Sequence, residues 1–309
     1  MPNRKLISFD WAMKRLLRSK SNFDVLEGFL SELLKNDIKI VDILESESNK
    51  ETNDDKFNRV DLKVKNQDDE IIIIEIQYDH ELDYFQRILY ATSKTIAEHL
   101  CEGQDYQKVV KVISINILFF NLGKGNDYIY QGTTRFTGLH DKDELCLTTT
   151  QQKMFSKQEP QDIFPEYYLI RVNKFNNIAR NSLDEWVYFL KNEEIQDSFQ
   201  AKGLRRAKEI LDVMNLPEDE RLAYTDFLEN KRYQSSMFQS TYVAGRLEGE
   251  QKGIQKGMER GIEKGMEQGV EKGLKKGRLE TAIMMKKNGE AVEKIMQYTQ
   301  ISAVEIENL

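Results

Sequence analysis

The chain has 309 residues, of which 39% are hydrophobic and 31% charged, and its formal net charge is −7. No apolar run approaches the ~18 residues that a membrane-spanning helix requires, and the first ten residues lack the apolar core of a signal peptide. The negative net charge provides no overall attraction to nucleic acid, so contact with DNA would require a local basic patch.

The first segment of the chain combines helical spacing with positive charge. Apolar residues recur at helical intervals from Phe9 to Lys35, and the pattern predicts a break near Ser19–Ser21. The acid Asp10 is the only acidic residue in the first 22 residues, against six cations, namely Arg4, Lys5, Lys14, Arg15, Arg18 and Lys20. These cations are either a solvated helix face or, if they lie beside an acidic site, groups that hold phosphates.

Two strand-like segments, residues 58–65 and 70–78, predict a β-hairpin. Both are rich in β-branched residues that alternate with period two, and the turn-like segment Asn66–Asp69 separates them. If the loop consists of the last three of these turn residues, the register places Asp61 directly opposite Glu75, with their Cβ atoms roughly 5 Å apart.

The hairpin therefore brings two carboxylates together. Asp61 shares its face of the first strand with Arg59 and Lys63, and Glu75 shares its face of the second strand with Gln77. Two facing carboxylates repel each other, so a hard divalent cation is the natural occupant, since Mg²⁺ binds one or two carboxylate oxygens plus waters. The alternative, which the spacing alone leaves open, is a pair of acids on the solvated face of an ordinary hairpin.

The segments around the hairpin complete the order of elements. Residues 38–44 form a short apolar strand before it, and residues 82–100 have the spacing of an amphipathic helix after it. Residues 108–121 are apolar enough for a strand that is buried on both faces. With the first helical segment, the order is α-β-β-β-α-β, which predicts an α/β fold with a mixed sheet and the two acids on its second and third strands.

This order and these residues resemble the PD-(D/E)XK nuclease superfamily, and within it the Rpn branch of recombination-promoting nucleases and transposases of bacteria. Asp61 matches the motif aspartate, and Glu75-Ile76-Gln77 matches the E-x-K element, which that branch writes E-x-Q. The resemblance covers roughly residues 5–235 and includes four further segments, residues 83–90, 103–109, 167–175 and 183–186.

The resemblance implies a restriction-endonuclease-like core and a DNA endonuclease that hydrolyses phosphodiester bonds with Mg²⁺, or with Mn²⁺ in its place. Asp61, Glu75 and the main-chain carbonyl of Ile76 would bind the metal. The wider superfamily has a lysine where this chain has Gln77, and an amide orients a water or a phosphate but carries no positive charge and accepts no proton. The proton acceptor is left open between Lys63, on the same face, and a second metal-bound water.

The family pattern also assigns roles outside the two strands. An acid of the first helix assists, for which Asp10 is the candidate, and Tyr84 and Arg87 of the following helix contact the substrate. Arg59, which adds positive charge on the face of the hairpin that carries Asp61, is a further candidate for contact with the substrate. The glutamine at position 77 and the negative net charge support a second hypothesis, a catalytically weak DNA-binding or assembly protein built on a degenerate nuclease fold. Binding of Mg²⁺ or Mn²⁺ and nicking of plasmid DNA distinguish the two hypotheses.

The second half of the chain continues with strands and then helices. Four strand-like stretches are expected to extend the sheet or to form a small β appendage, namely residues 128–130, 133–139, 145–149 and 167–172. Residues 183–238 have helical spacing, and Pro217 suits the first turn of a helix.

Glycine occupies every fourth position from Gly245 to Gly277, and after the first two triplets the residues between the glycines settle into the order apolar, Glu or Gln, then Lys or Arg, as in Ile262-Glu263-Lys264. Such a glycine-repeat tail is typical of the family. Each glycine weakens a helix by roughly 1 kcal/mol relative to alanine, so an isolated helix would be marginal. The repeat is either a helix stabilised by packing its glycine line on another chain or a flexible charged spacer. We expect the former, a homo-oligomer assembled through the tail.

Three short helical segments, residues 281–287, 291–297 and 303–309, end the sequence. They are either a miniature helix-turn-helix or a small helical cap, and their few basic and amide residues favour the cap. We therefore expect four parts: a nuclease-like domain (1–180), a helical region (181–240), a repeat tail (241–280) and a small helical segment (281–309).

The two cysteines, Cys101 and Cys146, are far apart, and neither lies in a C-x-x-C motif. This argues against a disulfide framework and a zinc site. Together with the absence of an apolar segment, it leads us to expect a cytoplasmic protein that binds DNA and no membrane.

Overall fold

The computed structural model describes residues 6–44, 61–100 and 105–309, and the chain divides into two compact units, Met1–Phe227 and Leu228–Leu309. The first unit contains a six-stranded mixed sheet with the strand order β1-β2-β3-β4-β6-β5. Its strands are β1 (Ile40–Leu44), β2 (Leu62–Asn66), β3 (Ile71–Gln77), β4 (Val112–Leu118), β5 (Ile129–Gly132) and β6 (Glu166–Arg171). An α/β fold with a mixed sheet is therefore confirmed.

Strands β1, β2 and β3 pair antiparallel, β3, β4 and β6 pair parallel, and β5 adds an antiparallel edge. In the β2–β3 hairpin Leu62 pairs with Ile74 and Lys65 with Ile71. One step beyond the first pair, Asp61 faces Glu75, so the predicted register is confirmed.

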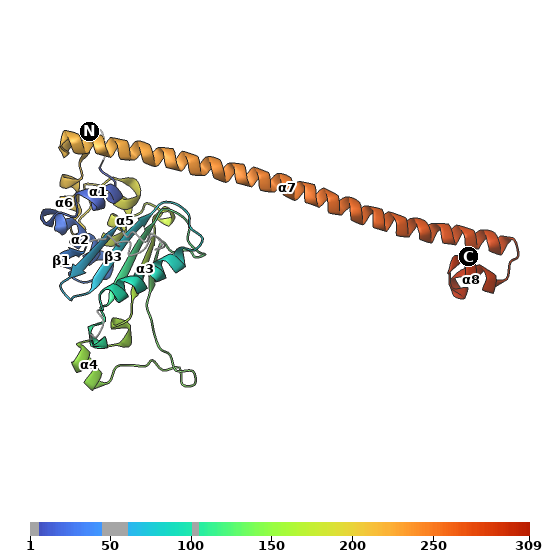
Figure 1. The fold of residues 1–309 in the computed structure, drawn as a ribbon, viewed down its shortest axis with the longest axis horizontal. Coiled ribbons are helices and arrows are strands. Elements are labelled where there is room, and N and C mark those ends of the chain that lie inside the picture. The colour runs from blue at the N-terminus through green and yellow to red at the C-terminus, as the bar shows by residue number, and fades with distance from the viewer. Residues whose placement is uncertain (1–5, 45–60, 101–104) are drawn as a thin grey trace. The chain divides into compact units, whose positions relative to one another are not determined.

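Helices lie on both faces of the sheet (Figure 1). Residues of β3 alternate between the faces, because Ile71 and Ile73 pack against Ala91 of α3, while Ile72 and Ile74 are buried on the opposite side. The helices of the first unit are α1 (Phe9–Arg15), α2 (Phe23–Leu34), α3 (Tyr84–Glu98), α4 (Thr149–Phe155), α5 (Ser182–Asn192), α6 (Leu204–Ile210) and the start of α7 (Glu218–Lys287). Short 3-10 turns occur at Lys20–Asn22, Tyr106–Lys108, Pro160–Asp162, Val172–Lys174 and Val213–Asn215.

Helix α1 is short but firmly held. Its first residue, Phe9, makes edge-on ring contacts with Phe29 of α2 and with Trp186 and Phe189 of α5. The main-chain N–H of Ser8 donates to the Tyr224 hydroxyl at 3.0 Å. The break predicted between two helical stretches is confirmed by the 3-10 turn at Lys20–Asn22. These contacts fix the position from which α1 presents its polar side chains.

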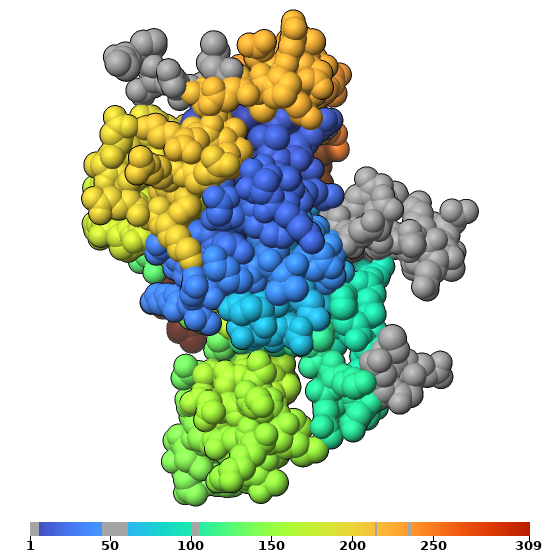
Figure 2. Space-filling model, turned by 90° about the vertical axis from the view of Figure 1, so that its left-hand side faces the viewer, coloured from blue at the N-terminus to red at the C-terminus, as the bar shows by residue number. Residues whose placement is uncertain are grey.

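Residues 133–165, between β5 and β6, differ from expectation. The predicted stretches at 128–130 and 167–172 correspond to β5 and β6, but 133–139 and 145–149 form no strand apart from one isolated bridge between Thr137 and Glu144. The physical reason at the second stretch is a capping box, in which Thr148 and Gln151 exchange hydrogen bonds and start helix α4. Figure 2 shows this segment, coloured yellow-green, as a lobe at the lower end of the view.

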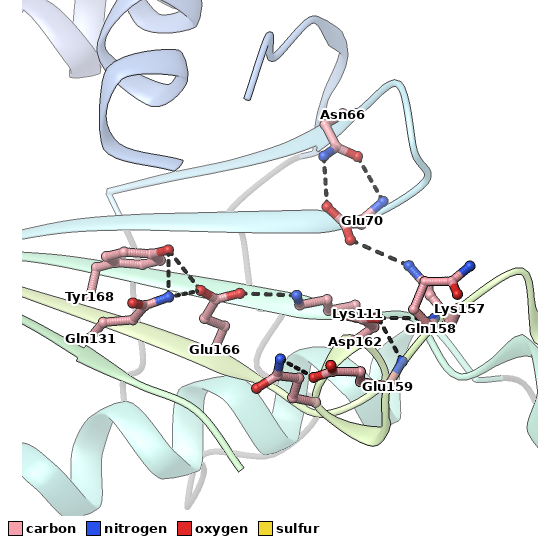
Figure 3. Close-up of polar contacts among 11 residues, drawn as sticks. Asn66, Glu70, Lys111, Gln131, Lys157, Gln158, Glu159, Asp162, Glu166 and Tyr168 are labelled. Carbon is pink, nitrogen blue, oxygen red and sulfur yellow. Dashed lines mark hydrogen bonds and ion pairs between the residues drawn. The ribbon is translucent and has the colours of Figure 1, made fainter. Parts of the chain in front are cut away.

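Polar contacts tie this lobe to the ends of the strands (Figure 3). Lys157, just after α4, lies 3.5 Å from Glu70 in the β2–β3 turn, and Glu70 also accepts from Asn66. At the start of β6, Glu166 pairs with Lys111 at 2.9 Å and accepts hydrogen bonds from Gln131 and Tyr168. This network lies at the amino-terminal ends of β4 and β6, whereas Glu75 lies near the carboxyl end of β3.

The second unit consists of helices. Helix α7 runs without interruption from Glu218, directly after Pro217, to Lys287, and it is followed by α8 (Val292–Thr299) and α9 (Ala303–Glu307). Ala282, Ile295 and Ile306 form a small core that joins these three helices. In α7 the glycine repeat is helical, and a Cβ added at any repeat glycine would meet no atom within 4 Å apart from the neighbouring backbone of its own helix.

The expected borders between the last three parts of the chain, after residues 240 and 280, both fall inside helix α7. The division into four parts therefore stays a prediction. None of the helices in the part of the chain that the structure describes is long and apolar enough to cross a membrane.

Candidate active site

Asp61 lies directly before β2, and its side chain contacts the neighbouring strand β3. Its Oδ2 accepts a hydrogen bond from the main-chain N–H of Ile76 at 2.7 Å. In a strand the N–H and C=O of one residue point toward the same edge, so the Ile76 carbonyl projects to the side on which Asp61 lies. The predicted trio of Asp61, Glu75 and Ile76 is thus brought together at one place.

Glu75 is almost completely buried, with 3% of its surface exposed. Its Oε1 contacts Nη2 of Arg87 from the first turn of α3. Burial raises the pKa of Glu75 to about 7, an effect that Arg87 opposes and the Asp61 carboxylate reinforces. A buried acid with this pKa can exchange its proton for another cation near neutral pH.

Gln77 and Arg87 meet at a second acid, Glu81, in the loop between β3 and α3. Nη1 of Arg87 lies 2.6 Å from Glu81 Oε1, and the Gln77 amide donates to the same oxygen at 2.9 Å. Gln77, Glu81, Arg87 and Glu75 therefore form one continuous polar chain, in which the amide of Gln77 serves as a hydrogen-bond donor.

Helix α1 and the residues directly after it contribute cations that contact Asp61. The Lys14 ammonium lies 2.6 Å from Asp10 Oδ1 and 3.3 Å from Asp61 Oδ1, and Arg18 donates to the main-chain carbonyl of Asp61 at 2.9 Å. Asp10, predicted from the family pattern, is 5% exposed and joins the site through Lys14.

The surroundings of Asp61 and Lys14 shift the pKa of both side chains. Burial raises the pKa of Asp61, although the Lys14 ammonium and the Ile76 N–H act to lower it. Burial by itself would lower the pKa of Lys14, but the carboxylates of Asp61 and Asp10 raise it overall, so the ammonium keeps its charge.

Three predicted residues stand elsewhere or outside the described residues. The Lys63 ammonium pairs with Glu98, at the far end of α3, at 3.0 Å. Tyr84 is fully buried, and its hydroxyl donates to Asn116 at 3.0 Å, so it reaches a core partner and not the surface. Arg59 lies outside the residues that the structure describes.

Sequence reasoning missed three side chains of this region, the bridging role of Lys14, the shared acceptor Glu81, and Asn116. Asn116 pairs with Glu75 across β3 and β4 and is 1% exposed. Its signal was visible, because Ser114 and Asn116 interrupt an apolar strand with period two, and such alternation marks one polar face. Nothing in the local sequence could have paired Lys14 with Asp61, since that contact depends on the fold.

The donor set fits a hard divalent cation. No group of three or more His, Cys, Asp or Glu side chains suited to a metal occurs within residues 6–44, 61–100 and 105–309. Mg²⁺ nevertheless needs only one or two carboxylates plus waters, and Asp61, Glu75 and the Ile76 carbonyl are all hard oxygen donors. In the metal-free chain, the cations Lys14 and Arg87 neutralise these two acids.

The sheet, with one acid directly before β2, a second acid on β3 and helices on both faces, defines a nuclease-like α/β core. Residues 7–240 match the family described as PD-(D/E)XK nuclease family transposase, and the chain belongs to this family. No curated protein and no solved structure matches the chain significantly.

Proposed function

We propose that this protein is a metal-dependent DNA endonuclease of the transposase and recombination-promoting class, which hydrolyses phosphodiester bonds at Asp61 and Glu75. The observation that carries the proposal is the hydrogen bond from the Ile76 N–H to Asp61, which fixes the partly buried carboxylate of Asp61 beside the buried carboxylate of Glu75. Two carboxylates held side by side repel each other, and a cation bound between them turns this repulsion into attraction for the metal.

Asp61, Glu75 and the Ile76 carbonyl would hold Mg²⁺, or Mn²⁺ in its place. A divalent cation at this point supplies Lewis-acid activation of water and offsets charge on the phosphate.

The chain's own residues do the positioning. The Gln77 amide, which donates to Glu81 at 2.9 Å and to the Asp79 carbonyl at 3.4 Å, would exchange one of these acceptors for a water or a phosphate oxygen. Arg87 meanwhile holds Glu81 and Glu75 in place.

DNA would approach from the side of α1, where the local charge is positive. Arg18, next to Asp61, and Lys20 at the following 3-10 turn are exposed and suit contact with phosphates that flank the cleaved bond. Tyr84 acts at most as a positioning residue, because its buried ring lies beneath the Arg87 guanidinium, 5.9 Å from ring centroid to Cζ.

The second candidate function is a catalytically weak DNA-binding or assembly protein with a degenerate nuclease fold. Two observations favour it: Gln77 replaces the superfamily lysine, and the Lys63 ammonium is engaged with Glu98.

Nicking of supercoiled plasmid separates the two functions. The full chain should convert supercoiled plasmid to open circles in Mg²⁺ or Mn²⁺ and should leave it intact in EDTA. DNA binding without any strand break in either metal would reject the endonuclease and favour the second candidate.

We further propose that α7 assembles copies of the chain. An exposed apolar side chain follows each repeat glycine from Gly253 to Gly273, among them Ile254, Met258, Ile262 and Met266, whose exposed fractions are 60% or more. Removing residues after Tyr242 should lower the molar mass of the particle measured by light scattering, because this apolar line would be lost. A full-length protein that is monomeric at high concentration would contradict assembly through the tail.

A further inference from the structure

The E-x-K element lacks its lysine, and the structure brings another lysine, Lys14, to Asp61, the acid next to this element. We propose that Lys14 of α1 supplies the ammonium that contacts the cleaved phosphate, in place of the lysine that Gln77 replaces. The inference rests on the proposed endonuclease function and names a catalytic residue for it.

The cations around the two acids differ in how far they are committed to other partners. In the described part of the chain, Lys63 pairs with Glu98, and both terminal nitrogens of Arg87 contact acids, Nη2 at Glu75 and Nη1 at Glu81. Lys14 differs from Lys63 because its partners, Asp10 and Asp61, belong to the site. It differs from Arg87 because its single ammonium carries three N–H donors for these two partners, whereas each terminal nitrogen of Arg87 is directed at an acid.

The exposure of Lys14 suits contact with a bound polymer. Its side chain is 44% exposed, whereas the side chains of Asp10 and Asp61 are 6% and 16% exposed. The ammonium therefore contacts the buried carboxylate of Asp10 and the partly buried carboxylate of Asp61, and part of the lysine side chain stays open to solvent. An ammonium has three donors, and with two directed at Asp10 and Asp61 the third is available for a phosphate oxygen.

Lys14 is held in place by a rigid element. It lies one helical turn after Asp10 in α1, and α1 is fixed by the ring contacts of Phe9 and the hydrogen bond from Ser8 to Tyr224. Asp10 is thus a positioning residue that holds the ammonium, which gives the buried acid of the first helix a physical role.

The chemistry asks only for a fixed positive charge. In the hydrolysis a water oxygen bonds to phosphorus, the bond from phosphorus to one sugar oxygen breaks, the water releases a proton to solvent, and the leaving oxygen takes one up. Lys14 stays protonated throughout and hydrogen-bonds a non-bridging oxygen, where negative charge accumulates. One such preorganised donor contributes a factor of about 10²–10³ in rate.

The decisive experiment moves the lysine between the two positions. Lys14→Gln should lower the single-turnover nicking rate by about 10²–10³-fold. Lys14→Arg, which keeps the charge, should retain most of the rate. The double variant Lys14→Gln/Gln77→Lys should recover at least about tenfold over Lys14→Gln. Lys65→Gln, which removes an ion pair with Asp69 at the far end of β2, is the matched control and should stay within about twofold of wild type.

Two binding measurements separate this inference from the proposed function. Affinity for Mn²⁺ should be unchanged or tighter in Lys14→Gln, because a competing cation has been removed. Affinity for a DNA duplex in Ca²⁺, measured by fluorescence anisotropy, should fall, and the slope of log affinity against log salt should drop by about one.

The outcomes are distinct. The assignment of Lys14 is overturned if wild type nicks DNA and Lys14→Gln nicks it within about threefold of the wild-type rate. It is also overturned if Lys14→Gln and Lys14→Arg both lose Mn²⁺ affinity or both lose their thermal unfolding transition. If wild type fails to nick at all, the proposed function fails. The duplex measurement in Ca²⁺ then still decides whether Lys14 contacts phosphate.

Discussion

Replacing Asp61 with asparagine is expected to abolish metal-dependent nicking, a loss on the order of 10³-fold or more, while the fold survives. Asparagine removes the negative charge that a cation needs. Its side-chain oxygen can still accept the hydrogen bond that Asp61 Oδ2 accepts from the Ile76 N–H, so the hairpin should keep its geometry. Alanine is a poorer choice, because a buried N–H without a partner costs about 1–3 kcal/mol.

Asp42→Asn is the matched control, since Asp42 is an exposed acid on the neighbouring strand β1. It should nick plasmid at the wild-type rate. Asp61→Asn and wild type should have melting temperatures within a few degrees of each other in EDTA. A variant that nicks as fast as wild type would remove Asp61 from the mechanism, and a large loss of stability would mark it as structural.

Glu75→Gln is expected to stabilise the metal-free protein at high pH and to leave it unchanged at low pH. The pKa of Glu75 is raised to about 7 by burial, from an ordinary value of 4.5. An acid with a raised pKa binds its proton more tightly in the folded state, so wild type loses stability as the pH rises from 4.5 through 7. Glutamine has no proton to lose. The difference should grow to roughly 3 kcal/mol above pH 8, since one pKa unit corresponds to about 1.4 kcal/mol.

Urea unfolding at several pH values between 4 and 9, in EDTA, measures this difference. Glu144→Gln, at an exposed ion pair with Arg135, serves as the control, and its offset from wild type should stay small at every pH. A Glu75→Gln protein that is less stable than wild type above pH 8 would show that the ion pair with Arg87 outweighs burial of the charge.

The hairpin could be predicted from the sequence because its signals are local. Alternation with period two assigned Asp61 and Glu75 to one face, and the short turn set the register that pairs them. The predicted site residues Asp61, Glu75, Ile76 and Gln77 accordingly lie together. Their ion-pair partners follow from helix packing, so the roles of Lys14 and Glu81 were out of reach of any local pattern.

The fold was less predictable where short-range capping competes with strand propensity. Residues 145–149 alternate like a strand, but Thr148 starts helix α4 through its capping box with Gln151. In β4 the predicted burial on both faces was correct, and the polar pair Ser114 and Asn116 was overlooked within it. The glycine repeat showed the opposite difficulty, since propensity alone does not decide between a helix and a spacer, and the structure has a continuous helix there.

We propose that Asp61 and Glu75 together bind the divalent cation with which the chain cleaves DNA. The most direct measurement is calorimetric titration of Mn²⁺ into the metal-free full chain at pH 6, in two buffers that differ in ionisation enthalpy. Wild type should bind the cation and release close to one proton, because Glu75 gives up its proton to the metal, and Asp61→Asn should bind far more weakly. Equal affinity in wild type and Asp61→Asn, or no binding by wild type, would contradict the account.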